Sequence, residues 1–264
     1  MKYKLGIIGI GVMGQAILNA IVNQNIVSNK EIALFDISHE KLMQFNEFAK
    51  FNSANELIQN SHYILIAVKP QNFKELSEDI NCTDDNIIIS IMAGLKISSI
   101  RALLNSNCGI ARIMPNTPCK IGCGISAISY SNITKEQQDF IRAIFKACGE
   151  VIDIDESQFD AITSVSGSGP AYVYTFIDAM IKGGIDGGLS YDESKKLTIQ
   201  TIIGTAQLAL NSDDDIDILI DRVCSKGGTT IEAIDFFKKN GLTKIIRDGM
   251  LACKNKSESM GKLL

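Results

Sequence analysis

The chain has 264 residues, of which 45% are hydrophobic and 21% charged, and its formal net charge is -4. This is the composition of a soluble globular protein, and the mild acidity argues against nucleic-acid binding, which needs a basic face. The seven cysteines form no C-x-x-C pair and there are two histidines, so we expect reduced thiols in the cytoplasm and no metal cluster. No segment reaches the ~18 uninterrupted apolar residues of a membrane helix.

Short apolar runs alternate with helical patterns through the first half of the chain. Such runs suit a parallel sheet that is buried on both faces, and the alternation predicts a doubly wound sheet of Rossmann type over residues 1–155. Strands are expected at 5–8, 32–35, 63–68, 87–91, 109–114, 125–129 and 150–154, and helices at 12–24, 38–49, 71–79, 97–105 and 134–147. Lys2 and Lys4 before the first apolar run superficially resemble a signal peptide, but glycines soon interrupt the run, as in a strand that enters a phosphate loop.

The pattern changes near residue 155, after which no convincing strand follows. The segment 171–185 is apolar on most of its circumference, and such a helix must be buried in its own domain or against another subunit. We therefore predict an all-helical dimerisation domain over 156–264, and the family resemblance described below implies that the same domain binds the substrate. Its helices are expected near 168–186, 190–211, 213–223, 229–240 and 242–255.

The first motif, G-I-G-V-M-G at 9–14, follows a predicted strand and opens a predicted helix. Gly9 permits a tight turn, Gly11 lets the backbone approach a pyrophosphate, and Gly14 allows close packing of helix on strand. The helix N-terminus, with Val12 and Met13, offers free N–H groups to phosphate. This context favours dinucleotide binding over a glycine-rich turn that binds nothing.

Asp36 lies 22 residues after Gly14, at the end of the second predicted strand. A carboxylate there can accept from the ribose hydroxyls of a dinucleotide and would repel a 2′-phosphate, so it favours NADH over NADPH. His39 and Lys41 are close enough in sequence to soften this preference. Asp36 can equally serve the start of the helix that follows, and both roles are compatible.

Other polar residues follow predicted strands or precede helices, each with a simpler structural interpretation. Lys69 closes one strand at the ligand edge of the sheet but could be a solvated loop charge, and Asn55 precedes a short helix that it could merely cap. The loop 112–118, R-I-M-P-N-T-P, could be the wall of a nicotinamide site or only a stiff turn. The segments 166–172 and 225–230 are both candidate carboxylate cradles at helix starts, and either could be only a capped start.

Taken together these segments resemble the pyrroline-5-carboxylate reductase family, from Gly6 to about Gly261. Any one motif is weak, but five in this order are specific: G-I-G-V-M-G, A-V-K-P-Q at 67–71, M-P-N-T-P at 114–118, S-G-S-G-P-A-Y at 166–172 and S-K-G-G-T-T at 225–230. The resemblance implies reduction of 1-pyrroline-5-carboxylate to L-proline with NADPH or NADH. It also implies an interlocked dimer that commonly assembles further into decamers.

The resemblance also implies the sites. Ala67, Val68, Lys69, Pro70 and Asn116 would lie by the cofactor. Backbone N–H groups of the second loop would bind the substrate carboxylate beside Thr230, in a site at the dimer interface; its residues are Ser225, Gly227, Gly228, Thr229 and Thr230. The usual loop has Thr and Pro where this chain has Cys224 and Lys226, so one hydroxyl and some rigidity are lost.

The motifs contain few candidate acid–base catalysts, which fits a substrate that is a cyclic imine, because water can protonate the imine before it binds. The cofactor would supply the hydride, and Thr230 would act by positioning. One alternative is a β-hydroxy acid dehydrogenase, which would need a catalytic lysine in the helix after the glycines at 166–169, where the first lysine is Lys182. The other is a non-catalytic dinucleotide sensor or interaction module, which would not need the loop 225–230.

Overall fold

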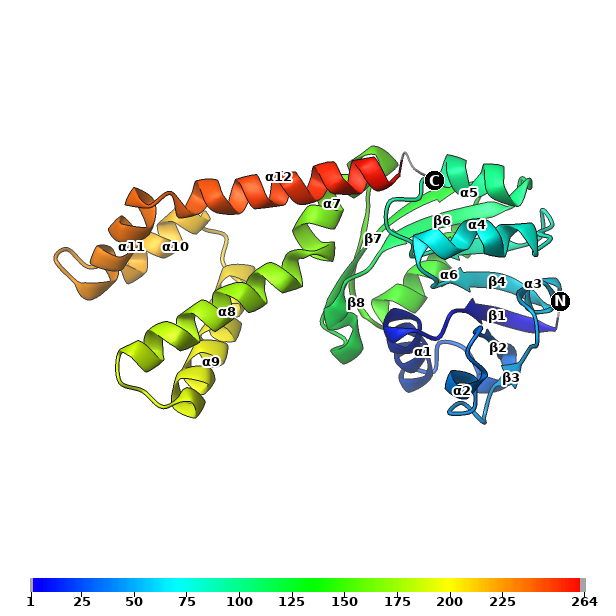
Figure 1. Cartoon of the computed structure of the whole chain (residues 1–264), viewed down its shortest axis with the longest axis horizontal. Helices are drawn as coiled ribbons and strands as arrows, with labels where there is room; N and C mark the ends of the chain where they lie inside the picture. Colours follow the sequence, from blue (N-terminus) through cyan, green and yellow to red (C-terminus); the bar gives the residue numbers. More distant parts are fainter. Residues whose placement is uncertain (1, 262–264) are drawn as a thin grey trace. The chain divides into compact units, whose positions relative to one another are not determined.

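The structure is a computed structural model that describes residues 2–261. The chain divides into two compact units, one running to Pro170 and resuming at Ala252, the other being Ala171–Leu251 (Figure 1). Of the helical domain that the sequence predicts, residues 262–264 lie outside the described part of the chain.

The first unit is built on one eight-stranded sheet of order β3-β2-β1-β4-β5-β6-β7-β8. All neighbouring strands are parallel except β6 and β7. The strand order reverses between β1 and β4, and in open α/β sheets that point opens a crevice at the carboxyl ends of the strands. The strands are β1 (Tyr3–Ile8), β2 (Ile32–Phe35), β3 (Ala49–Lys50), β4 (Ser61–Ile66), β5 (Ile87–Ser90), β6 (Gly109–Met114), β7 (Gly124–Ser131) and β8 (Gly149–Asp153).

Helices cover both faces of this sheet, as a doubly wound fold requires (Figure 1). Alternate residues of each strand supply the two cores: Leu5 and Ile7 of β1 join the core under α1 (Val12–Asn23) and α6 (Lys135–Lys146), and Ile8 joins the other. The second core lies under α3 (Ala54–Asn60), α4 (Pro70–Glu78) and α5 (Ile97–Leu104). The predicted fold class is confirmed.

Two local details differ from the sequence prediction. The expected helix 38–49 is only the short α2 (His39–Leu42), and the chain then makes turns before the edge strand β3. That strand has two residues, too few for an alternating or apolar pattern to show. The short 3-10 turns of this unit are Asn29–Glu31, Thr117–Ile121 and Glu156–Gln158.

After β8 the described chain is helical, as expected. A short α7 (Phe159–Ile162) passes through a π-helical turn, Thr163–Gly167, into α8 (Gly169–Asp186), and the Ser168 N–H donates to the Thr163 carbonyl at 2.8 Å. The helix expected to start at 168 therefore continues one that starts at Phe159. The helix start expected at 166–172 is wrong, because this segment lies inside a continuous helical run, and the candidate carboxylate cradle loses the free helix start on which it rested.

The remaining helices follow the expected order, with bounds shifted by a few residues. They are α9 (Tyr191–Leu210), α10 (Ile216–Val223), α11 (Thr229–Lys239) and α12 (Leu242–Met260). Within residues 2–261, none of the helices combines the length and the apolar character that crossing a bilayer demands.

Candidate functional site

The glycine motif forms the turn between β1 and α1. Gly9 has a φ of +97°, a conformation that glycine adopts readily, and its N–H donates to the Phe35 carbonyl at 2.8 Å. A Cβ on Gly14 would lie 2.1 Å from the Gly9 oxygen, so only glycine lets α1 approach this closely. A Cβ on Gly11 would meet nothing within 4 Å, because its Cα faces open space.

That open space is a cavity of about 850 Å³ at the carboxyl ends of β1, β2 and β4. Its size lies within the ~300–1,000 Å³ of small-molecule and cofactor sites. It brings together seven residues that the sequence predicts for the cofactor: Gly9, Gly11, Asp36, Asn55, Ala67, Val68 and Lys69. The bare glycine edge and the free amides of the first turn of α1 fit the pyrophosphate of a dinucleotide.

Asp36 joins the second strand to the glycine turn. Its Oδ2 accepts from the Ile10 N–H at 2.7 Å and its Oδ1 from the Ser38 N–H at 2.8 Å, while Lys41 Nζ lies 3.8 Å from Oδ1. The residue is only 7% exposed, yet it lines the cavity. Its carboxylate therefore braces the turn that would hold the phosphates, and each oxygen keeps a further lone pair for another donor.

Five predicted cofactor residues do not line this cavity: Val12, Met13, Gly14, Pro70 and Asn116. Met13, in the first turn of α1, packs against the core, and Pro70 is the first residue of α4. Asn116 is buried, and its Oδ1 accepts from the Ile125 N–H at 3.0 Å, so it fixes the loop that follows β6.

Asn55 reaches the cavity from inside α3 and not from before it. Ser53 is the capping residue of that helix, since its Oγ accepts from the Glu56 N–H at 3.2 Å. Asn55 Oδ1 instead accepts from the Asn81 N–H at 2.9 Å. The expectation that Asn55 precedes the helix and caps it is therefore wrong.

Sequence reasoning missed the cavity wall that α4 supplies. Asn72, Glu75 and Leu76 of α4 and its C-cap residue Asp79 line the cavity and recur at the three- and four-residue spacing of one helix face. That spacing is visible in the sequence, but only the structure shows that this face looks towards the ligand edge. Lys41, which the sequence places near Asp36, also lines the cavity, and the other missed lining residues are Ile8, Phe35, Ile37, Asn52, Ser53 and Ala54.

The second candidate site is the loop between α10 and α11, in the unit Ala171–Leu251. Gly227 has a φ of +71°, and the Gly228 N–H donates to the Ser225 carbonyl at 2.9 Å, which closes a tight turn before Thr229. The first-turn amides of α11 have no partner within the helix. Ser225, Gly227 and Thr229 are exposed, and Gly228 and Thr230 are half-buried. Cys224 is half-buried and Lys226 exposed.

Two family models match the chain, one over each part. Residues 4–94 match the model described as NADP oxidoreductase coenzyme F420-dependent, and residues 156–260 match Pyrroline-5-carboxylate reductase dimerisation. With the glycine turn and cavity described above, these matches define a nicotinamide-dependent oxidoreductase with a helical dimerisation part.

The chain is also similar along its whole length to proteins of known name. The chain is 33% identical to pyrroline-5-carboxylate reductase of Aquifex aeolicus, covering 100% of this chain and 98% of the relative, and 32% identical to that of Escherichia coli, covering 99% and 100%. A crystal structure of Plasmodium falciparum pyrroline carboxylate reductase with NADP bound matches with a TM-score of 0.91 at 32% identity, covering 99% of each chain. The chain belongs to the pyrroline-5-carboxylate reductase family, which confirms the resemblance.

Proposed function

We propose that this protein reduces 1-pyrroline-5-carboxylate to L-proline, the last step of proline biosynthesis, in the cytoplasm. The observation that carries the proposal is the glycine-edged cavity at the β1–β4 switch point, in a chain that reductases of this name match from end to end. Functionally we divide the chain at about residue 155, with the dinucleotide held by 1–155 and the substrate and dimer contacts by 156–264.

Each residue would act by binding and orientation. Gly9, Gly11 and the first turn of α1 would cradle the pyrophosphate, and Asp36 would accept from the ribose. The segment 67–70 and Asn116 would border the nicotinamide, which supplies hydride when bound. The amides of 225–230 would hold the substrate carboxylate, and Thr230 would hydrogen-bond near the imine nitrogen. No side chain is needed to deliver a proton, because water can protonate the imine beforehand.

A direct test is the loss of nicotinamide absorbance when 1-pyrroline-5-carboxylate is added to protein and NADH, with proline measured as the product. A β-hydroxy acid dehydrogenase would instead reduce NAD⁺ in the presence of its hydroxy acid. A dinucleotide sensor would bind NADH without consuming it. Either of these outcomes would contradict the proposal.

We also propose a preference for NADH over NADPH. A 2′-phosphate would come close to the carboxylate of Asp36, whose like charge disfavours it at a nearly buried position. Asp36→Ser should raise the NADPH/NADH ratio of kcat/KM roughly tenfold, since one such charge contact is worth about 1.4 kcal/mol. The KM for both cofactors should rise too, because the bonds to Ile10 and Ser38 are lost.

Lys41→Ala is the matched control. The lysine lines the same cavity beside Asp36, and its loss should move the ratio in the opposite direction, further towards NADH. A native enzyme that favours NADPH, or a ratio that Asp36→Ser leaves unchanged, would refute the ribose assignment of Asp36.

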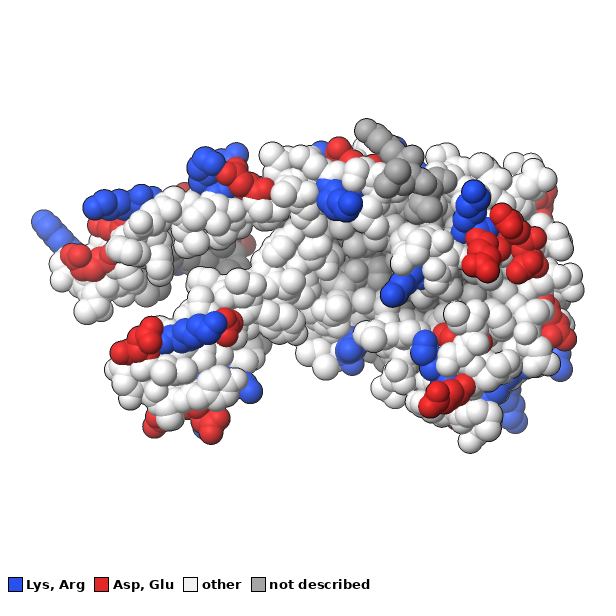
Figure 2. All heavy atoms as spheres, in the orientation of Figure 1, with Lys and Arg blue, Asp and Glu red and all other residues white. Residues whose placement is uncertain are grey.

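Self-association follows from the burial of the unit Ala171–Leu251, all of which is described. Ile181 is the one hydrophobic residue buried in it, so the unit has almost no core of its own. Figure 2 shows the charged side chains of these helices in separate groups with uncharged surface between them. The exposed large apolar residues include Val173, Tyr174, Phe176, Leu197, Ile203, Leu208, Phe236, Ile245 and Leu251.

We therefore expect a homodimer, or a larger assembly of dimers such as the decamers common in this family, at low micromolar concentration. Light scattering should give twice the chain mass of 28.8 kDa or a higher multiple. The active site would be complete only in that assembly. A stable, active monomer would overturn this prediction.

A further inference from the structure

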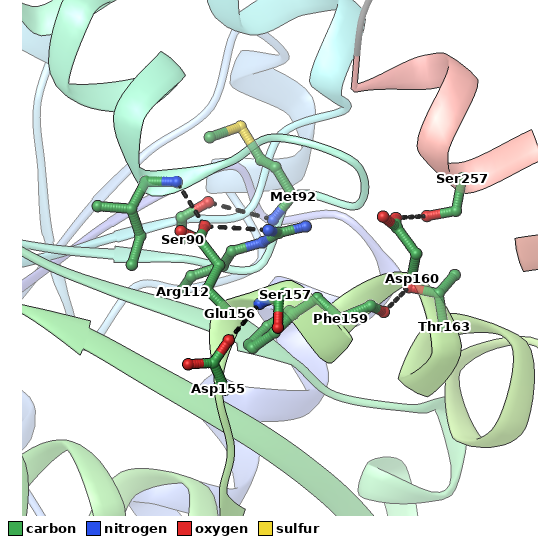
Figure 3. Close-up of polar contacts among 11 residues, drawn as sticks. Ser90, Met92, Arg112, Asp155, Glu156, Ser157, Phe159, Asp160, Thr163 and Ser257 are labelled. Carbon is green, nitrogen blue, oxygen red and sulfur yellow. Dashed lines mark hydrogen bonds and ion pairs between the residues drawn. The ribbon is translucent and has the colours of Figure 1, made fainter. Parts of the chain in front are cut away.

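An ion pair between a buried arginine and a half-buried glutamate lies next to the M-P-N-T-P loop. Arg112, on β6, is 4% exposed, and its Nη1 lies 3.0 Å from Oε1 of Glu156 (Figure 3). The guanidinium carbon stands 4.5 Å from the ring centroid of Phe159, the first residue of α7. Arg112 is thus held between the carboxylate of Glu156 and an aromatic face, two residues before Met114 opens the loop.

Glu156 links this arginine to the next strand–helix connection. The same Oε1 accepts from the Ile97 N–H at 2.6 Å, at the first residue of α5. One carboxylate oxygen therefore ties together β6, the start of α5 and the 3-10 turn that leads into α7. Since only one oxygen makes both contacts, a small movement of Glu156 disturbs both.

The neighbouring residues secure the ends of two long helices. Asp160 of α7 accepts from the Ser257 hydroxyl of α12 at 2.6 Å (Figure 3), and a Cβ on Gly261 would lie 2.6 Å from the Gly94 carbonyl oxygen. These residues all belong to the unit that runs to Pro170 and resumes at Ala252. α8, which continues α7, and α12 are the two helices by which the chain leaves and re-enters that unit.

The π-helical turn makes a direct contact with the loop. A Cβ on Gly167 would lie 2.4 Å from the terminal methyl of Met114, so the turn and this side chain already touch. The base of α8 therefore rests on the first residue of M-P-N-T-P, while Arg112 and Glu156 fix the backbone just behind it.

We propose that Arg112 and Glu156 are positioning residues for hydride transfer, because their ion pair holds the M-P-N-T-P loop in register with the bases of α8 and α12. The inference rests on the proposed function, in which this loop borders the nicotinamide and the helical part carries the substrate. An ion pair with a buried arginine adds little net stability over an apolar replacement, whereas removing one partner leaves the other charge uncompensated.

Removing one charge of the pair and removing both charges should therefore have different effects. Glu156→Gln keeps an oxygen for the Ile97 N–H but leaves Arg112 without its counter-charge, so both melting temperature and turnover should fall. The double variant Arg112→Met/Glu156→Gln removes both charges and should recover the melting temperature. Its kcat should stay depressed by about 10- to 100-fold, since a misplacement of about 1 Å can cost that much.

Two readouts separate positioning from general damage. With NADH deuterated at the transferred position, the kinetic isotope effect on kcat should rise in the double variant, because hydride transfer becomes slower than product release. The NADH dissociation constant should not change. The matched control is Arg101→Met: Arg101 bonds to the Cys108 carbonyl at 3.1 Å near the other end of β6, so its loss should lower the melting temperature without raising the isotope effect.

The outcomes are distinct. A double variant that regains both stability and native turnover, or one whose isotope effect is unchanged, would show that the pair is only structural. Should Glu156→Gln fail to fold, the double variant decides alone. If the native protein itself does not reduce pyrroline-5-carboxylate, the proposed function fails before the positioning role is tested.

Discussion

Gly14→Ala is expected to weaken NADH binding by about 100-fold and to lower the melting temperature. The added methyl would lie 2.1 Å from the Gly9 carbonyl oxygen and 3.3 Å from Cβ of Ala67. Neither the glycine turn nor the segment that follows β4 can move without a large energetic cost, so α1 must shift. Overpacking costs about 1–3 kcal/mol, which lowers the melting temperature by roughly 2–12 °C in a chain of this size. The shift moves the first-turn amides away from the phosphates, and their charge-assisted hydrogen bonds, worth about 1.5–3 kcal/mol each, are lost.

Gly11→Ala is the control from the same turn. Gly11 has a φ of -79° and open space beside it, so alanine fits the free protein and the melting temperature should not change. NADH binding should still weaken, because the methyl would occupy the cavity where the pyrophosphate lies. Titration of nicotinamide fluorescence and thermal melts on both variants test this. Tight NADH binding by Gly11→Ala would place the phosphates elsewhere.

The strands could be predicted because the sheet is buried on both faces. Strand β5, Ile87–Ser90, has three consecutive isoleucines, and such an unbroken apolar run is typical of a sheet that helices cover on both faces. The antiparallel pairing of β7 with β6 could not be predicted, because the direction of a strand leaves no trace in its composition. The π-helical turn at 163–167 was equally hidden, since one extra residue in a helical turn hardly alters the hydrophobic period.

Part of the site could also be predicted from the sequence, and part of it needed the folded structure. Glycines at fixed spacing predict the turn between β1 and α1, because few other residues tolerate its conformation and contacts. Asp36 was placed by its position after β2, but its bond to Ile10 joins residues 26 apart in sequence and needs the folded sheet. The pairing of Arg112 with Glu156 spans 44 residues, and nothing local marks either as a partner.

The low burial of the unit Ala171–Leu251 supports the predicted dimer. An all-round apolar helix at 171–185 must be buried in its own domain or against another subunit, and the sequence predicts a dimerisation domain. The unit Ala171–Leu251 buries one hydrophobic residue, Ile181, which favours coverage by another subunit. Binding energy between copies would then replace the core that this unit lacks.

Thr230→Ala is expected to weaken turnover without abolishing it. Thr230 is the second residue of α11, directly after the turn that Gly227 makes possible, and it is half-buried. Losing one hydrogen bond in a desolvated site costs about 1–3 kcal/mol. That corresponds to roughly a 5- to 150-fold fall in kcat/KM, at about tenfold per 1.36 kcal/mol. Thr230→Ser keeps the hydroxyl and should stay near the native rate.

The size of the loss separates positioning from proton donation. General acid catalysis contributes about 10²–10⁴-fold, so a residue that delivered the only available proton should cost more than the range given above. Donation should also add a pH dependence to kcat that the alanine variant lacks. NADH affinity should stay unchanged, because Thr230 belongs to the unit Ala171–Leu251 and the glycine turn does not. Native kinetics in Thr230→Ala would remove the residue from the site, and a loss confined to NADH binding would mean that the loop 225–230 serves the cofactor and not the substrate carboxylate.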